Sequence, residues 1–355
     1  EDTANNKHTD SASLIDFNRA GVPLMELVTE PVIHSAEDAG KFGRELQTLL
    51  RTLGVSDANM EKGEMRVELN LSVSATEKFG TKVEVKNINS FRAVEKAAKF
   101  EIERHIALLE EGRGNEIVQE TRGWDENKEI TFSQRTKENS EDYRYFPEPD
   151  LPKMYLHDVF DLDAMRKDLP ELPWQKREKY TSLGIKSEDV EVFVTDFEVG
   201  SFFEKVSSLL NDKEMMKKAS NYITTDLAGL RSAKSDFKMP EVEAFVSLIK
   251  MVGENKVNSR GAKDILAIIC EEGGLSAQAG NPEEIAKEKG LLQESNTDAI
   301  KEIVQKVIDA NQKVAEEYKS GNENVIKFLM GQVMKESKGS ANPQVATEIL
   351  IELPN

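Results

Sequence analysis

The sequence predicts an α+β protein: an N-terminal mixed α/β domain, then an all-helical middle domain, then a small helical tail domain. Three observations support this fold class. Residues 64–73 alternate strictly between apolar and polar side chains, as a strand with one buried face does. Apolar residues at helical spacing follow over residues 94–109. Beyond a proline-rich stretch at residues 147–173, the chain shows helical patterns almost throughout.

In the N-terminal domain, which we expect to span residues 1–168, strands flank a long helix. Apolar spacing predicts a first helix over residues 39–53, and Gly112 lies just past the second helix, where glycine commonly ends one. Period-two alternation and short β-type runs predict strands at residues 64–73, 81–88, 116–121 and 129–135. This order of elements is typical of an α+β sandwich.

The two helical domains are expected at residues 169–280 and 281–355. The proline-rich stretch before them indicates a stiff, extended connection, and a glycine-containing stretch at residues 271–284 separates the two domains. In the tail, two apolar stripes and a final helix predict three helices. Asn342 and Pro343 suit the cap and the first position of that final helix.

The composition limits the classes of function. The chain has 355 residues and a formal net charge of -18, which excludes general coating of nucleic acid but leaves room for a local basic site. Cys270 is the only cysteine, so an intrachain disulfide is excluded and a buried structural thiol is expected. No apolar run approaches the ~20 residues that cross a bilayer. The chain begins in polar sequence without Met, so we expect an N-terminally truncated chain.

Glu26 interrupts the apolar run of GVPLMELVTEP, where we expect a strand. Burying an unpaired carboxylate is costly, so such a residue is neutralised, exposed or bound to a cation. Glu68 stands on the polar face of the strand at residues 64–73. Carboxylates that converge need a divalent cation between them, and their hard oxygen atoms suit Mg²⁺. Two alternatives stay open: Glu68 pairs with Arg66 or a lysine on a solvated face, and Glu26 lies on an edge strand.

Two further groups of residues are candidates for binding an anion or a base. In EDYRYFPEPDL, Arg144 and Tyr143 suit gripping of a phosphate and stacking on a base, while an inter-domain plug of buried aromatics is the alternative. In KNINSFRAV, Asn87, Ser90 and Arg92 lie at the mouth of a helix, which favours an anion site. Ordinary helix capping by Asn89 or Ser90 competes with that role.

Several common catalytic motifs are absent from the sequence. It contains no GxxxxGK[ST] loop, no GxGxxG after a strand and no HExxH. The four histidines are scattered, and His105 falls beside the apolar stripe of its helix, which favours a structural role. Catalysis by this chain would therefore use carboxylates, arginine and asparagine.

Five long segments carry many distinctive positions: LIDFNRAGVPLMELVTEP, KFGTKVEVKNINSFRAVEKA, QETRGWDE, DYRYFPEPDLP and GQVMKESKGSANPQ. In this order and at this spacing they resemble the motifs of the B subunits of the glutamyl/aspartyl-tRNA amidotransferases. The resemblance covers nearly the whole chain. It implies a cradle domain at residues 1–168, with its N-terminal part missing, and a tRNA-binding tail.

The resemblance implies a reaction. In that family, the B subunit uses ATP to phosphorylate the side-chain carboxylate of mischarged Glu-tRNA(Gln) or Asp-tRNA(Asn), and ammonia then displaces the phosphate. Mg²⁺ neutralises the charge of the transferring phosphoryl group. The ammonia comes from a partner amidase (a glutaminase), which is the A subunit of the complex, and the small C subunit joins the two.

A rival hypothesis is a non-catalytic tRNA-binding scaffold fragment of the same complex. The family implies bacterial cytoplasm or an organelle matrix as the compartment, and no membrane partner. The sequence does not distinguish Glu-tRNA from Asp-tRNA as the substrate.

The resemblance also implies roles for single residues. Glu26 and Glu68 are expected to be catalytic and, with Glu1, to hold the metal, although relatives commonly carry Asp at the position of Glu68. An upstream strand with Glu and His is expected to complete the site, so a chain that starts at Glu1 should be a poor enzyme. The residues expected to bind ATP or substrate are Asn18, Arg19, Asn87, Ser90, Arg92, Tyr143 and Arg144. Those expected to bind tRNA are Lys335, Lys338 and Asn342.

Overall fold

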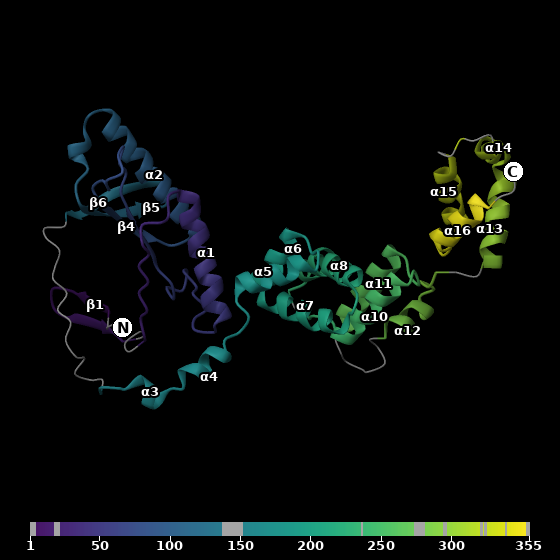
Figure 1. Cartoon of the computed structure of the whole chain (residues 1–355), viewed down its shortest axis with the longest axis horizontal. Helices are drawn as coiled ribbons and strands as arrows, with labels where there is room; N and C mark the ends of the chain where they lie inside the picture. The colour runs from purple at the N-terminus through teal and green to yellow at the C-terminus, as the bar shows by residue number, and fades with distance from the viewer. Residues whose placement is uncertain are drawn as a thin grey trace. The chain divides into compact units, whose positions relative to one another are not determined.

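The chain divides into two compact units, Glu1–Pro170 and Glu171–Asn355, in a computed structural model (Figure 1). The structure describes residues 5–17, 22–136, 152–235, 237–272, 281–293, 297–319, 322, 325–337 and 339–352. Strands and helices mix in the first unit and helices make up the second, which confirms the α+β class. The finer division into three domains stays a prediction. Within the described ranges, no helix combines the length and apolar character needed to cross a bilayer.

The first unit is built around a four-stranded sheet in the order β3-β4-β5-β6. Its strands are β3 (Val67–Leu71), β4 (Val83–Ile88), β5 (Glu120–Asp125) and β6 (Ile130–Thr136). The β4–β5 pair is parallel and the other two pairs are antiparallel. A parallel pair needs a crossover, and α2 (Phe91–Glu110) supplies it.

One face of this sheet packs on α2, and much of the contact is apolar. Val85, Ile88 and Trp124 of the sheet are buried together with Val94 and Ala97 of the helix. Alternate residues of β3 pack against the same core, as the period-two pattern at residues 64–73 predicted. The opposite face of β3 and β4 therefore carries polar residues, among them Glu68, Glu84 and Lys86.

A second helix, α1 (Ala36–Thr52), packs against α2. Ser35 caps it by accepting a hydrogen bond from the backbone N–H of Asp38 (3.0 Å). Gly40 and Gly43 let α1 approach closely, because any Cβ there would meet Glu95 or the ring of Phe91. The helix predicted at residues 39–53 is confirmed.

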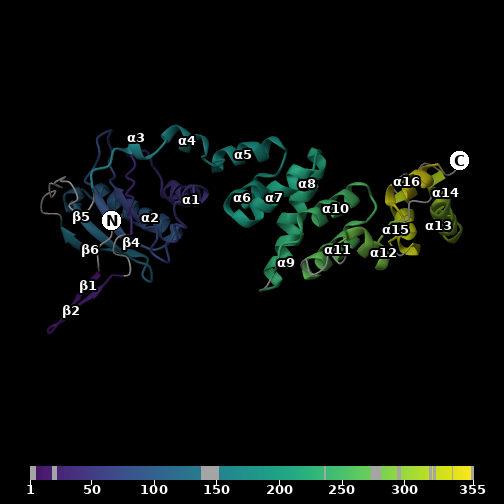
Figure 2. The same cartoon turned by 90° about the horizontal axis from the view of Figure 1, so that it is seen from below.

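Two predictions for the first unit are wrong, and one hairpin was missed. Residues 22–30 form no strand: the backbone around Glu26 is irregular, and Leu24, Met25, Leu27 and Val28 are exposed. The strand predicted at residues 116–121 begins later, at Glu120, because a 3-10 turn η1 (Gly114–Glu116) precedes it. A separate hairpin of β1 (Asn5–His8) and β2 (Ser13–Asp16) was not predicted (Figure 2).

The connection between the units is not simply extended. Its described part contains two short helices, α3 (Leu156–Val159) and α4 (Leu162–Lys167). The side chain of Asp161 caps α4 by accepting hydrogen bonds from two backbone N–H groups (3.1 and 3.0 Å).

Most of the second unit is a helical body around one apolar core. Its helices are α5 (Pro173–Ser182), α6 (Ser187–Thr195), α7 (Phe197–Leu209), α8 (Lys213–Asn221), a π-helical segment η2 (Tyr222–Leu227), α9 (Ala228–Ala233), α10 (Val242–Gly253), α11 (Ser259–Glu272) and α12 (Pro282–Glu288). The rings of Phe193 and Phe203 stack in the core with centroids 4.1 Å apart. Cys270 is buried there as predicted, and burial raises the pKa of its thiol to about 11.

The last helices surround a second apolar core, which includes Ile300, Val304, Leu329 and Leu350. They are α13 (Thr297–Ala310), α14 (Gln312–Lys319), α15 (Ile326–Glu336) and α16 (Pro343–Ile351). The prediction of three helices is wrong, because α14 follows α13 after a single turn residue, Asn311. The predicted cap of the final helix is confirmed, since the side chain of Asn342 accepts a hydrogen bond from the backbone N–H of Gln344 (3.0 Å).

Gly200 in α7 lies so close to the preceding helix that an added Cβ would be 2.1 Å from the Phe193 carbonyl oxygen. We expect Gly200→Ala to lower the free energy of unfolding by about 1–3 kcal/mol, as overpacking does. At Gly229 in α9 no atom lies within 4 Å of an added Cβ. Gly229→Ala, the control, should raise the free energy of unfolding by up to ~1 kcal/mol. Urea unfolding followed by circular dichroism measures both, and similar effects of the two changes would contradict the close approach.

Candidate active site

The face of the sheet opposite α2 carries a cluster of charged residues from neighbouring strands. Glu84 of β4 is 9% exposed, and its carboxylate accepts a hydrogen bond from the Thr121 hydroxyl of β5 (2.7 Å). Lys86 places Nζ 3.4 Å from Glu84 Oε1 and 3.3 Å from Oε2 of Glu68 on β3. We call these four residues the Lys86 cluster. Two strands thus bring two carboxylates to one ammonium group, and a third strand contributes the Thr121 hydroxyl that contacts Glu84.

The charge of Lys86 is held by its neighbours. Burial by itself would lower the pKa of the ammonium, but the carboxylates of Glu68 and Glu84 outweigh burial and raise that pKa above its usual value. Lys86 is therefore a cation at neutral pH. Its ammonium group lies within ion-pair distance of both carboxylates.

The carboxyl end of β4 leads directly into the N-terminus of α2. Asn87 has a left-handed backbone (φ 62°), which asparagine tolerates better than most residues, and it is exposed. Ser90 caps α2, because its hydroxyl oxygen accepts a hydrogen bond from the backbone N–H of Ala93 (3.1 Å). Arg92 is exposed in the first turn. In α/β folds, ligands bind outside the carboxyl ends of parallel strands, and β4–α2–β5 presents such an end here.

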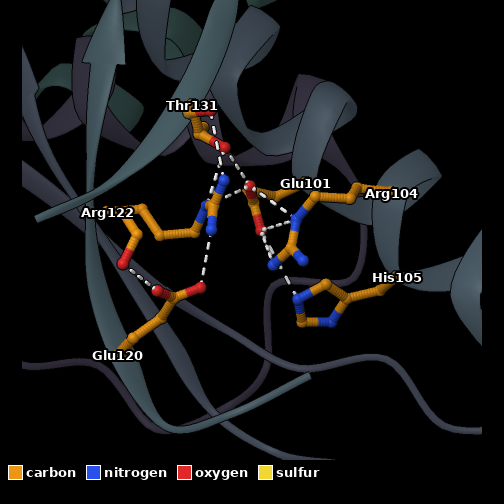
Figure 3. A network of polar contacts seen from close by, with 7 residues as sticks. Glu101, Arg104, His105, Glu120, Arg122 and Thr131 are labelled. Atoms are coloured by element: carbon orange, nitrogen blue, oxygen red, sulfur yellow. Dashed lines mark hydrogen bonds and ion pairs between the residues drawn. The ribbon is translucent and has the colours of Figure 1, made fainter. Parts of the chain in front are cut away.

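On the other face of the sheet, a buried polar network ties α2 to β5 and β6 (Figure 3). The carboxylate of Glu101, 0% exposed, accepts hydrogen bonds from Arg104 (Nη2, 2.7 Å) and from the Thr131 hydroxyl. Arg122 of β5 lies between two carboxylates, with Nε 3.1 Å from Glu101 Oε1 and Nη1 2.6 Å from Glu120 Oε1. A helix and two strands are therefore joined by charges removed from water.

The network keeps Glu101 ionised. Burial alone would raise the pKa of its carboxyl, but the contacts with His105, Arg104 and Thr131 outweigh burial and lower the pKa from 4.5 to about 2. His105 is fully buried, and its Nε2 lies 3.4 Å from Glu101 Oε2 without the geometry of a hydrogen bond. The structural role predicted for His105 agrees with this position.

The described residues alone do not form a magnesium site. Within the described ranges, no three His, Cys, Asp or Glu side chains gather as a metal would need. Glu26 is exposed on irregular backbone, and Glu68 contacts Lys86, the lysine pairing that the sequence left open as an alternative. The predicted third ligand, Glu1, lies outside the described residues. We therefore assign no step of the reaction to an ion from this geometry.

Other predicted site residues fall into two groups. Asn87, Ser90 and Arg92 come together at the start of α2 as expected, with Ser90 engaged in capping. Those outside the described residues are Asn18, Arg19, Tyr143, Arg144 and Lys338. Lys335 is exposed at the end of α15, whereas Asn342 is only 7% exposed. The predicted contact of Asn342 with tRNA stays a prediction. Burial of the Asn342 side chain does not favour it.

The sequence prediction missed Glu84, Lys86 and Thr121. A signal for the first two was present, because both occupy the positions of TKVEVKNI that alternate with the buried valines. Thr121 gave no such signal, since its partner Glu84 is 37 residues away in the chain.

The second unit contains a pocket of about 300 Å³ that none of the predicted site residues lines. Apolar side chains form most of its wall, and a pair between Arg231 and Asp196 (2.6 Å) lies at it. The π-helical segment η2 contributes Ile223 and Leu227.

Comparison with known families defines the class of protein. Residues 1–160, which contain the sheet, the Lys86 cluster and α2, match the family model described as the GatB/GatE catalytic domain. Residues 201–353 match the model described as the GatB domain. The chain thus combines a GatB/GatE catalytic domain with a GatB domain, in that order.

Individual relatives agree along nearly the whole chain. It is 39% identical over 359 residues to an aspartyl/glutamyl-tRNA(Asn/Gln) amidotransferase B subunit of Clostridium acetobutylicum, covering 99% of this chain and 73% of that protein. It is 41% identical over 359 residues to the B subunit of Persephonella marina, with the same coverage. It is 41% identical over 346 residues to the chloroplastic/mitochondrial glutamyl-tRNA(Gln) amidotransferase B subunit of Physcomitrium patens, covering 96% of this chain and 59% of that protein. The chain belongs to the family of amidotransferase B subunits, as its motifs predicted.

Replacing Glu101 with glutamine tests the buried network. Glu101→Gln keeps the shape of the side chain but removes the charge that Arg104 and Arg122 share. We expect the free energy of unfolding at neutral pH to fall by about 3 kcal/mol. A lowered pKa contributes stability that is complete above pH 4.5 and is lost as the pH falls toward 2. The difference between the variant and the unaltered chain should therefore shrink over that window.

Denaturant unfolding at a series of pH values measures this difference. Glu103→Gln is the control, because Glu103 is exposed on the same helix and pairs only loosely with Lys99 (3.9 Å). It should change the free energy of unfolding by less than ~0.5 kcal/mol. A deficit of Glu101→Gln that is independent of pH down to the acid limit would contradict an ionised, stabilising Glu101.

Proposed function

We propose that this chain carries out the ATP-dependent transamidation of mischarged Glu-tRNA(Gln), Asp-tRNA(Asn) or both. The observation that carries this proposal is the match of nearly the whole chain, at 39–41% identity, to relatives named as amidotransferase B subunits. Two of those names include both tRNAs, and one names tRNA(Gln) alone. In the cell the chain acts in bacterial cytoplasm or in an organelle matrix, and one of these relatives is named as chloroplastic/mitochondrial.

The proposed reaction has two steps. The side-chain carboxylate of the misacylated amino acid attacks the γ-phosphorus of ATP, forming an acyl phosphate and ADP. Ammonia then attacks the acyl carbon, inorganic phosphate leaves, and the amide is formed as one proton is released. A carboxylate alone is a poor acylating agent, so the phosphate supplies the leaving group. Ammonia must travel without meeting bulk water, where protonation would remove its nucleophilic lone pair.

The proposal includes partner subunits and a metal ion. A partner amidase, the A subunit of the complex, releases ammonia from glutamine, and the small C subunit joins the two. Glu26 and Glu1 would help to hold Mg²⁺, which would supply charge neutralisation at the phosphates of ATP. Glu26 is exposed. Its carboxylate could therefore bind an ion whose other ligands lie outside the described residues.

The start of α2 is the proposed contact for an anionic group of the substrate. Arg92 is exposed in the first turn of a 20-residue helix, whose N-terminus carries a partial positive charge. Asn87 adds an exposed amide at the same junction. Asn18, Arg19, Tyr143 and Arg144, with Ser90, complete the proposed set for ATP and substrate.

Formation of Gln-tRNA from Glu-tRNA tests the proposed function. The chain with its A and C partners should convert Glu-tRNA(Gln) in the presence of ATP and Mg²⁺, with glutamine or ammonium as donor. Glu26→Gln should lower this rate by about 100-fold or more, as loss of a group that stabilises transferring charge does. Affinity for tRNA should be unchanged.

Glu30→Gln is the matched control, because Glu30 lies four residues on in the same exposed segment. It should leave the rate unaltered. If the unaltered complex binds tRNA but forms no product, the chain is a scaffold; if Glu26→Gln and Glu30→Gln behave alike, Glu26 has no part in the reaction.

The tail is the proposed tRNA-binding part, through Lys335 and Lys338. Lys335 is exposed, and each lysine that contacts a phosphate releases about one counterion. Lys335→Ala should weaken tRNA binding and reduce the slope of log K against log salt by about 1. Lys327→Ala, on an exposed position of the same helix, is the control. Binding measured over a salt series that gives equal slopes for both variants would remove Lys335 from the contact.

A further inference from the structure

We propose that Lys86 binds the transferring phosphoryl group in the proposed reaction, and that Glu68 and Glu84 position Lys86 and do not hold the metal. This inference rests on the proposed function for the identity of the anion. It reassigns Glu68, which the family resemblance placed among the metal ligands.

The first argument is the geometry around the ammonium group. Its distances of 3.3 Å to Glu68 and 3.4 Å to Glu84 place Nζ between two carboxylates from neighbouring strands. Glu84 is itself fixed, because its second oxygen accepts the hydrogen bond from Thr121. A lysine side chain with four rotatable bonds is thereby held in one position on a rigid sheet.

The second argument is that the Lys86 ammonium group already occupies the position beside Glu68 where a metal ion would bind. An ammonium group in contact with a carboxylate repels a divalent ion that would bind to the same oxygen atoms. Mg²⁺ also needs several oxygen ligands in octahedral arrangement. Glu68 and Glu84 are the carboxylates that contact Lys86 in the described structure, and they belong to no group of three potential ligands there.

The third argument is where the cluster faces. Lys86 lies on the face of the sheet that α2 does not cover, and its side chain remains 34% exposed. The next residue, Asn87, begins the junction at the carboxyl end of β4 where ligands of α/β folds bind. An ammonium has three N–H donors, and two carboxylates occupy two of them. Among the residues that the structure describes, Glu68 and Glu84 are the ion-pair partners given for Lys86, so the third N–H can meet an anionic oxygen from solution.

A double-mutant cycle on ATP-dependent transamidation, run over a series of Mg²⁺ concentrations, tests the assignment. Lys86→Met should lower kcat by about 100-fold, as loss of a charged donor to developing negative charge does. Glu68→Gln should lower kcat by about 10-fold, as loss of one charged hydrogen-bond partner does, at an unchanged half-saturating Mg²⁺ concentration. The double variant should be no slower than Lys86→Met alone, because Glu68 acts through Lys86.

A metal-ligand role for Glu68 predicts the opposite. Glu68→Gln would then raise the half-saturating Mg²⁺ concentration tenfold or more, and its effect would add to that of Lys86→Met. Either result overturns the inference. Glu77→Gln, an exposed glutamate in the β3–β4 loop, is the control and should leave all constants unchanged. Unfolding midpoints of the variants within a few degrees of the unaltered chain show that they fold.

A measurement without catalysis tests the contact itself. Acetylation of lysines by a water-soluble reagent, read by mass spectrometry, should modify Lys86 in the free complex and not when ATP and Mg²⁺ are bound. Lys99, 72% exposed on α2, should react equally in both states. Reaction of Lys86 that is unaffected by bound ATP overturns the inference. Absence of ATP-dependent product from the unaltered complex would overturn the proposed function instead.

Discussion

The ionised carboxylate of Glu101, buried between Arg104 of its own helix and Arg122 of β5, is the interaction on which the first unit depends. Apolar contacts between a helix and a sheet are non-directional, so they alone do not select one position of the helix along the strands. Hydrogen bonds between buried charges are directional, and a shift of α2 would leave those charges unpaired at a large cost. The network therefore fixes where α2 begins, and with it the position of Ser90 and Arg92 at the end of β4.

Strand β5 serves both faces of the sheet. Glu120 and Arg122 point to α2 and belong to the buried network, while Thr121 between them points to the other face and holds Glu84. The position of the Lys86 cluster is thus tied to the position of α2 through one strand. The face that packs on α2 provides rigidity, and the opposite face leaves the side chains of Lys86 and Glu68 partly exposed. A rigid sheet of this kind suits the proposed site, whose charged side chains must stabilise phosphate charge without changing position.

The sequence predicted the general layout well and the site only in part. Alternation at residues 64–73 placed Glu68 on a polar face, because this follows from local spacing. For the start of α2 the sequence left capping by Asn89 or Ser90 open against an anion site, and the structure shows that Ser90 caps the helix. The strand around Glu26 was wrong: an apolar run predicts burial only if another element covers it, and within the described ranges Leu24 and Val28 are exposed. The helix α14 was missed because Asn311 breaks the apolar pattern for a single turn.

The sequence by itself determined the α+β class, the family and the polar face of residues 64–73, because periodicity and long motifs are properties of neighbouring residues. Only the tertiary structure decided that Glu68 meets Lys86 and that Glu101 reaches Arg122 and Thr131. These pairs depend on the strand order β3-β4-β5-β6 and on the position of α2 across it. Strand order is set by the packing of the whole unit, so the local periodicity of the sequence does not predict it.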